Sequence, residues 1–379
     1  MIMKKIILLL TTFLLLLNSL AYADEFEDGV QAYKQGNFEK AFKLFRPLAE
    51  QGKVLAQFNL GLMYNKGRGV TQDNNQAFNW YRKSAQQGYA EAQYNLGVLY
   101  RDGQGVIQDY LKAAEWFEKS AEQGYAHGQL SLGALYENGN GVTQDHRKAF
   151  YLFNKAAAQG LAEAQFNLGL MFENGISVKQ DYKQAFDWYK KAAELDYALA
   201  QNSTGTMYAK GEGVTKDDNQ AAEWFRKAAE QGQVLAQYNL AMMYGRGKGV
   251  PQDDKHAFEW FKKAADQGFW EAQYRLGWIY ENGRGVTQNY IFAFDWYKKA
   301  TEQGDSKALY NFGLLYGTGR GVKQDSVRSY MWLDMAAVKN YDGAINLRDS
   351  VAGLMTKSEI SEAQKLAREC EKNNYKNCD

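Results

Sequence analysis

The sequence predicts an all-α solenoid of stacked helix hairpins, because two residue types recur at a fixed interval of 36 positions. Tryptophan follows this interval with one leucine in the series, at Trp80, Trp116, Leu152, Trp188, Trp224, Trp260, Trp296 and Trp332. Glycine follows it with one alanine, at Gly61, Gly97, Gly133, Gly169, Gly205, Ala241, Gly277 and Gly313. Self-similarity of this length is typical of repeated supersecondary units, so the 379 residues predict one elongated array rather than several globular domains.

Each copy of the repeat contains two helical patterns. In the first copy, Ala56, Leu60 and Met63 lie at helical spacing and predict the buried stripe of a first helix, which we call helix A. Gly67 predicts the end of helix A in left-handed backbone, and Gly61 predicts a close approach of the second helix, helix B. The tryptophan series lies on helix B and is interpreted as core, with stacking of sugars or bases as the alternative.

An acidic residue, or in one copy an asparagine, precedes each helix B pattern. Its side-chain oxygen can accept hydrogen bonds from the first N–H groups of the helix. The dense oxygen spacing of a calcium-binding loop is absent, so we interpret this series as helix caps. Its members are Asp73, Asp109, Asp145, Asp181, Asp217, Asp253, Asn289 and Asp325.

The amino-terminal residues 1–23 predict a secretory signal peptide. Two lysines precede an apolar run that ends near Leu17, and a small-residue site predicts cleavage between Ala23 and Asp24. An uncleaved membrane anchor is the alternative, but the run is shorter than the roughly 20 residues that a spanning helix needs. We therefore expect an exported protein, periplasmic or secreted, without stable membrane insertion after cleavage.

Three further segments follow along the chain. Residues 24–52 predict a helix pair that resembles a tetratricopeptide repeat and caps the stack. Residues 53–340 predict eight repeats. Residues 341–379 predict C-terminal capping helices with a cysteine-containing tail. Cys370 and Cys378 are the only cysteines, and export favours a disulfide between them; two unpaired cysteines are the alternative.

The charge balance argues against some partners. Removal of Lys4 and Lys5 from the formal net charge of +1 leaves −1 for the mature chain, so we expect no binding to nucleic acid. The two cysteines and three scattered histidines lack metal-ligand spacing, so we expect neither a metal site nor a cofactor.

Read across the copies, the motif is Ala-x-x-x-Leu-Gly-x-x-Tyr-x-x-Gly-x-Gly-Val-x-x-Asp-x-x-x-Ala-x-x-Trp, followed by an alanine pair and a glycine. This motif closely resembles the Sel1-like repeat family, a relative of the tetratricopeptide repeat. The resemblance implies antiparallel helix pairs in a right-handed superhelix and an adaptor that holds other proteins. In exported members it implies a role in envelope assembly or in contact with host molecules, such as immunoglobulin. The motif is broken at Leu152, Ser177, Asp196 and Ala241.

Catalytic motifs are missing from the sequence. Some cysteine-rich secreted relatives are linked to β-lactam binding or hydrolysis, but this chain lacks cysteine pairs within its repeats. No serine is followed by lysine three residues later, and no phosphate-binding Gly-Lys-Ser/Thr loop occurs. We expect a non-catalytic protein, and a hydrolase that recognises cell-wall glycans or β-lactams is the alternative.

The candidate binding surface is the side of helix A that faces away from its buried stripe, which would line the concave surface of a superhelix. Aromatic side chains recur there and suit binding to a protein or an extended peptide; packing between neighbouring A helices is the alternative. Trp278 stands out because other copies carry smaller residues at its position. Charges of both signs near the rim, at Arg101, Glu137, Glu173, Lys210, Arg246 and Glu281, could select a partner. The binding candidates are Phe58, Tyr94, Phe166, Tyr238, Tyr274, Trp278 and Tyr310.

Overall fold

The computed structural model describes residues 24–378, which form helices joined by turns and contain no strand. Ala23 and the rest of the expected signal peptide lie outside the described residues. A helical segment at 24–34 precedes the other helices. They are α2 Phe38–Glu50, α3 Val54–Lys66, α4 Asn74–Gln86, α5 Ala90–Asp102, α6 Tyr110–Glu122, α7 Ala126–Asn138, α8 His146–Ala158, α9 Ala162–Asn174, α10 Tyr182–Glu194, α11 Ala198–Lys210, α12 Asp218–Glu230, α13 Val234–Arg246, α14 Asp254–Asp266, α15 Trp270–Asn282, α16 Tyr290–Thr301, α17 Ser306–Thr318, α18 Ser326–Val338, α19 Ala344–Ala352 and α20 Lys357–Lys372.

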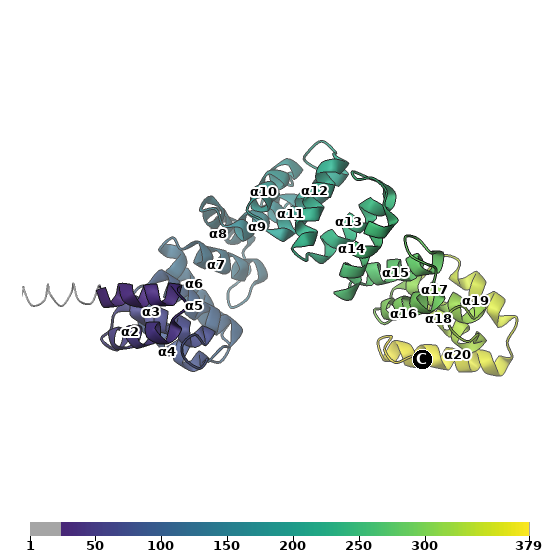
Figure 1. The fold of residues 1–379 in the computed structure, drawn as a ribbon, viewed down its shortest axis with the longest axis horizontal. Coiled ribbons are helices and arrows are strands. Elements are labelled where there is room, and N and C mark those ends of the chain that lie inside the picture. Colours follow the sequence, from purple (N-terminus) through teal and green to yellow (C-terminus); the bar gives the residue numbers. More distant parts are fainter. Residues whose placement is uncertain (1–23, 379) are drawn as a thin grey trace, which may run out of the picture. The chain divides into compact units, whose positions relative to one another are not determined.

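The chain divides into two compact units, at residues 1–188 and 189–379. Within each unit, consecutive helices pack as antiparallel hairpins, as Figure 1 shows for α3 with α4 and for α13 with α14. From α3 onwards the odd-numbered helices up to α17 are the A helices and the even-numbered helices up to α18 are the B helices. The predicted all-α fold of repeated helix hairpins is therefore confirmed.

The turn from helix A to helix B is set by two local signals. Gly67 ends α3 with a φ of 64°, in the left-handed region that glycine adopts at low cost. At the start of α4, the Asp73 carboxylate accepts hydrogen bonds from the backbone N–H groups of Asn75 and Gln76. Side chains at all eight positions of the predicted series accept such bonds, which confirms them as helix caps.

Three positions hold non-glycine residues where other copies have glycine in the left-handed region. Ser177, Asp196 and Asn340 have φ values of 62°, 60° and 57°, so the turn geometry persists at all three. Left-handed backbone costs a residue with a side chain roughly 1–2 kcal/mol. The sequence departures at these positions therefore leave the architecture intact but store backbone strain in it.

The core of most hairpins is an aromatic ring packed on a helix A glycine; Ala241 replaces the glycine in α13, and Leu333 replaces the ring in α18. A Cβ atom added to Gly61 would lie 2.7 Å from Cδ1 of Tyr81, which shows how closely this ring covers the glycine. Gly97 and Gly277 meet Phe117 and Tyr297 in the same way. These rings are almost completely buried and form the series Tyr81, Phe117, Phe153, Tyr189, Phe225, Phe261 and Tyr297.

The sequence predicts that the tryptophans of the 36-residue series are core residues, but only some of them are buried. Trp224 and Trp332 are buried, but Trp80 and its counterparts in α6, α10, α14 and α16 are half-buried. Trp80 packs on the core of the preceding layer, which contains Leu60, and the ammonium group of Lys83 lies 3.9 Å from its ring centroid. The interpretation of this series as simple core is corrected accordingly: most of its members join neighbouring layers and are covered on one side by lysine.

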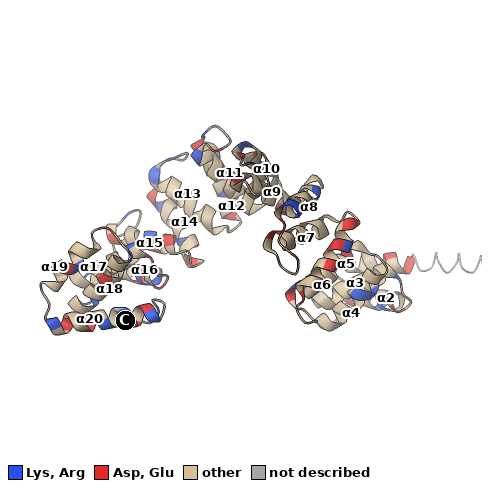
Figure 2. Cartoon of the chain, turned by 180° about the vertical axis from the view of Figure 1, so that it is seen from behind, with Lys and Arg blue, Asp and Glu red and all other residues tan. Residues whose placement is uncertain are grey.

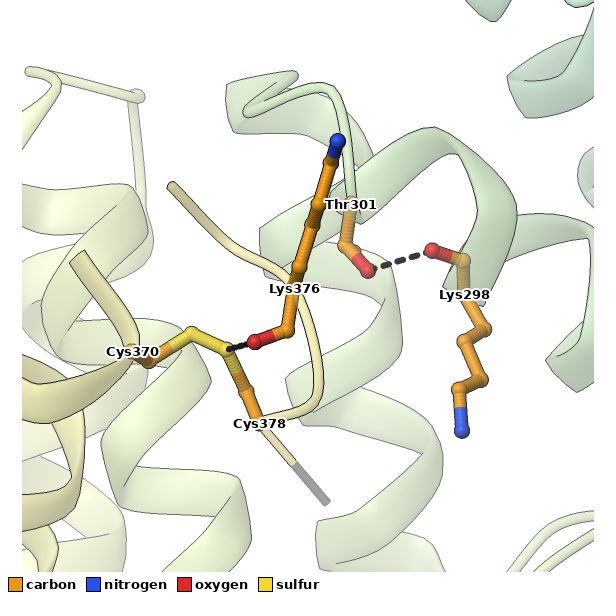
Figure 3. Close-up of a disulfide and its surroundings, with 5 residues drawn as sticks. All are labelled: Lys298, Thr301, Cys370, Lys376 and Cys378. Carbon is orange, nitrogen blue, oxygen red and sulfur yellow. Dashed lines mark hydrogen bonds between the residues drawn. A yellow bond between two sulfur atoms is a disulfide. The ribbon is translucent and has the colours of Figure 1, made fainter. Parts of the chain in front are cut away.

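The carboxyl end closes the second unit. Helix α20 packs on α18 and begins with a reciprocal capping box between Thr356 and Glu359. Cys370, at 2% exposure, is joined to Cys378 by a disulfide, the pair expected from the sequence (Figure 3). The turn between them packs Tyr375 against Gly304 of the preceding hairpin. Between residues 24 and 378, no helix combines the length and the apolar character that crossing a membrane requires.

Candidate functional site

The outer face of the A helices carries exposed apolar side chains. On α3, α11 and α13 the same position holds Leu55, Leu199 and Leu235, which are 43–44% exposed. On α15, Trp278 is 37% exposed. Large apolar side chains at this exposure lose contact with water when a partner covers them, which favours association.

The aromatic candidates lie beside this face and are half-buried. Phe58 packs against Tyr81 of its own hairpin and against Tyr89 at the entrance to the next A helix, with ring centroids 5.8 and 5.0 Å apart. Tyr238 packs in the same way against Phe261 and Phe269. Each ring thus spans the boundary between one hairpin and the following helix.

Of the other aromatic candidates, Tyr94 has the same two contacts. Tyr94 contacts Phe117 and Tyr125, and burial raises the pKa of its phenol. Tyr274 contacts Tyr297, and Phe166 is half-buried. Tyr310 contacts Tyr341. All of these rings are half-buried, so part of each is taken up by packing within the protein.

A hollow of about 200 Å³ opens beside Trp278, and we call it the Trp278 hollow. Its buried lining is apolar and includes Phe261 and Ile279. Trp278 and Met242 also line it. Three arginines line it as well, namely Arg246 of α13, Arg275 of α15 and Arg284 of the turn that follows α15.

A second hollow, of about 290 Å³, lies one repeat earlier between α11, α12 and α13, and we call it the Thr206 hollow. It shares Met242 and Arg246 with the Trp278 hollow, so the two are neighbours. Most of their lining residues correspond at the 36-residue interval: Thr206 with Met242, Ala209 with Gly245, Lys210 with Arg246, Asp218 with Asp254, Phe225 with Phe261, Asn239 with Arg275, Met242 with Trp278, Met243 with Ile279 and Lys248 with Arg284. They are one structural site in two consecutive copies.

Positive charge dominates both hollows. The cations are Lys210, Lys216, Arg246, Lys248, Arg275 and Arg284, and the anions are Asp218 and Asp254.

Both anions are already paired. Asp254 lies 3.0 Å from Arg284, and Asp218 lies 3.9 Å from Lys216. Among residues 24–378, no carboxylate forms an ion pair with Arg246, Lys248 or Arg275, the last of which lies 5.9 Å from the ring centroid of Tyr274. The two hollows therefore retain unneutralised positive charge.

The rim charges expected from the sequence have different surroundings. Arg101 is paired with the adjacent Asp102 at 2.7 Å, and Lys210 with Glu212 at 3.4 Å. Glu281 accepts a hydrogen bond from the buried Tyr297 hydroxyl. Of the six expected rim charges, the structure places only Lys210 and Arg246 in the hollows.

Sequence reasoning did not identify the hollows. Their signal is a small residue where other copies carry a long side chain: Ala209 and Gly245 stand at the position of Arg101, Glu137 and Glu173. Within the described part of the chain, histidine, cysteine, aspartate and glutamate side chains form no group of three that could hold a metal ion.

Comparison with known proteins gives one consistent family. The Sel1 repeat model matches nine consecutive segments, at residues 18–53, 54–89, 90–125, 126–161, 162–197, 198–233, 234–269, 270–305 and 306–341. The first match covers the whole segment 24–52 expected to be a tetratricopeptide-like cap, and its residues 18–23 lie outside the described structure.

Among the solved structures similar to this chain are two that cover most of it. One is a protective antigen present in uropathogenic Escherichia coli strains and displaying an SLR fold, which is 32% identical, with 93% of each chain covered and a TM-score of 0.52. The other is a Sel1 repeat protein from Oxalobacter formigenes, 33% identical, with 82% of this chain and 90% of that chain covered and a TM-score of 0.62. No curated protein matches the sequence.

Proposed function

We propose, since the chain belongs to the Sel1 repeat family, that it is an exported, non-catalytic scaffold that binds a protein or an extended peptide on the outer face of its A helices. Sel1 repeat proteins are generally protein-interaction scaffolds. The observation that carries the proposal is the repeated exposure of Leu199, Leu235 and Trp278 on the A helices of the second unit, with Leu55 exposed on an A helix of the first unit. Helix surfaces that present apolar residues in register suit an elongated partner.

Export is supported by three independent features. The first is the apolar amino-terminal segment with its small-residue cleavage site. The second is the disulfide between Cys370 and Cys378, because such bonds persist in oxidising compartments. The third is the similar Escherichia coli protein, which is a protective antigen. A partner in the cell envelope or a host protein, immunoglobulin included, is consistent with this location.

Site-specific photo-crosslinking tests the binding face. A benzophenone amino acid is placed at Leu235 or Trp278, and in a matched control at Phe292, an exposed aromatic residue of α16. We expect crosslinks to a discrete partner from envelope or host extracts at Leu235 and Trp278 but not at Phe292. Equal crosslinking at all three positions would count against the A-helix face.

Export has its own test. Mass spectrometry of the protein recovered from cell fractions should give a mature chain that begins at Asp24, outside the cytoplasm. An intact amino terminus with Lys4 and Lys5 still present in a cytoplasmic fraction would exclude the proposed location, whatever the outcome of the crosslinking.

A further inference from the structure

We infer that the Thr206 and Trp278 hollows together bind an acidic peptide in extended conformation, with apolar side chains in the hollows and carboxylates on their cationic rim. This inference rests on the proposed function and specifies the partner's chemistry. It concerns residues 206–284, which lie within the second unit.

The first step is the apolar lining. Phe225 lies in the Thr206 hollow and Phe261 in the Trp278 hollow, both at 5% exposure or less. Met242 stands between the hollows and contributes to each. Unbranched methionine side chains adapt to differently shaped ligands, so this wall suits an apolar anchor of variable shape.

The second step is the charge. Arg246 lines both hollows, and Arg275 and Lys248 each line one. Since none of the three forms an ion pair within the described chain, a bound carboxylate gains their attraction without breaking an existing pair. Arginine is particularly suited to this role because its planar guanidinium binds a carboxylate through two parallel hydrogen bonds.

The third step is the spacing. Equivalent residues in the two hollows are one repeat apart, and packed helix layers lie on the order of 10 Å from one another. Three residues of a polyproline II segment span about 9 Å and return to the same side of the peptide. A peptide with apolar residues at positions i and i+3, and acidic residues around them, therefore matches both hollows.

The fourth step separates a peptide from nucleic acid. Single-stranded nucleic acid is held by bases stacking on open aromatic faces. Phe225 and Phe261 are buried, which leaves Trp278 as the exposed aromatic residue of the two hollows. One exposed ring and apolar pockets fit side chains better than a row of bases.

The experiment uses the full chain and a fluorescent synthetic peptide with two leucines three residues apart among aspartates and glutamates. One comparison peptide replaces every acid by its amide, and a second places the two leucines side by side. We expect the acidic, correctly spaced peptide to bind at least about tenfold more tightly than either, with affinity that falls as salt is added.

Two substitutions of Gly245 distinguish the effect of filling the Trp278 hollow from the effect of adding a negative charge to it. Gly245→Glu introduces the residue that Glu137, Glu173 and Glu281 hold at the equivalent position, and an added Cβ would meet only the Cβ of Ala257, at 3.7 Å. Glutamate should abolish binding because it fills the Trp278 hollow with a carboxylate. Gly245→Gln fills the same space without charge and should weaken binding less.

Variants that remove positive charge from the rim of the hollows test the attraction of carboxylates. Arg246→Gln with Arg275→Gln should weaken binding roughly tenfold or more, because two charge-assisted contacts are lost together. Lys66→Gln, at the position equivalent to Arg246 but on α3 of the first unit, should leave affinity unchanged.

Three results would overturn the inference. Equal affinity for the acidic and amide peptides would show that the rim does not select carboxylates, although the A-helix face would remain a peptide-binding surface. Tighter binding of an oligodeoxythymidylate than of the acidic peptide would assign the hollows to nucleic acid. Partner crosslinking at Leu235 and Trp278 without any affinity for the acidic peptide would sustain the proposed function and exclude this partner class.

Discussion

One position on the A helices carries a long charged side chain in α5, α7 and α9 of the first unit but a small residue, Ala209 or Gly245, in α11 and α13 of the second. Glu137 of α7 stands where Gly245 of α13 stands, and burial raises the pKa of its carboxyl group. At the next position, Asp102 of α5 pairs with Arg101, whereas its equivalent Arg246 of α13 forms no ion pair within the described chain. Figure 2 shows where charges of each sign fall along the helices. An identical backbone repeat thus yields different surfaces through a few side chains that do not affect the core.

This comparison explains how a repeat protein gains specificity. The glycine and ring positions that join helix A to helix B, such as Gly97 with Phe117 and Gly205 with Phe225, are alike in both units. The outer positions are free to vary because they contact solvent or a partner. We therefore expect the two units to differ strongly in what they bind and only slightly in how their helices pack. Four sets of substitutions test this expectation.

The largest effect on stability is expected from the disulfide that closes the second unit. Changing both Cys370 and Cys378 to serine should destabilise the contact of α20 with α18 by about 2–3 kcal/mol, from the entropy of the opened loop. Hydrogen exchange measures this locally, which suits a repeat array whose parts unfold separately. The amides of α3 to α6 serve as the internal control, and faster exchange there would contradict a local effect.

A second contrast sets a core glycine of the first unit against an outer glycine of the second. A Cβ at Gly133 would lie 2.7 Å from Phe153, so Gly133→Ala should destabilise its hairpin by about 1–2 kcal/mol through overpacking. Gly245→Ala meets only an ordinary contact and should stabilise by about 0.5–1 kcal/mol through helix propensity. Thermal unfolding of both variants gives the signs, and equal signs would refute the assignment of Gly133 to the core.

The strained turn at Ser177 belongs to the first unit and gives the third contrast. Ser177→Gly should stabilise the adjacent helices by about 1 kcal/mol, because glycine adopts a positive φ without strain. Asp196→Gly should gain less, since the Asp196 carboxylate accepts a hydrogen bond from Gln201 that the variant loses. An equal or greater gain at Asp196 would mean that backbone strain does not govern these turns.

The smallest expected effect is electrostatic and concerns Glu137. Burial raises the pKa of its carboxyl group, with His146 acting in the opposite direction. A raised pKa in the folded state means that ionisation costs stability above that pKa and that this cost disappears as the pH falls below the ordinary value of 4.5. Glu137→Gln should therefore raise the melting temperature at pH 7 and not at pH 4. A gain that is independent of pH would point to packing instead.

The sequence was sufficient for features set by local chemistry. Asp73 and its counterparts cap helices because an acceptor before a helix needs no tertiary context, and Gly67 ends a helix for an equally local reason. Local sequence does not decide whether the ring of Trp80 or the ring of Tyr81 packs into the hairpin core. Adjacent helical residues differ by about 100° in direction, and only the contact with Gly61 decides between them.

The hollows were beyond sequence reasoning for a related reason. They arise where side chains are short, at Ala209 and Gly245, and where cations from helix and turn meet, as Arg275 and Arg284 do. A missing side chain gives no signal in one sequence unless its repeat equivalents are aligned and compared. That comparison shows the substitution, but only the packed helices show that the space remains open.

The most direct test of the central claim is to map where a bound acidic peptide lies on the full chain. A photoreactive group replaces one leucine of the probe peptide, and the crosslinked residues are identified by mass spectrometry. We predict crosslinks to Met242, Trp278 and their neighbours in α13 and α15 of the second unit. Crosslinks to the equivalent Val98 and Ala134 of α5 and α7 in comparable yield would contradict the account. Repeats with a long charged side chain at the Gly245 position would then bind the peptide as well as repeats with a small one.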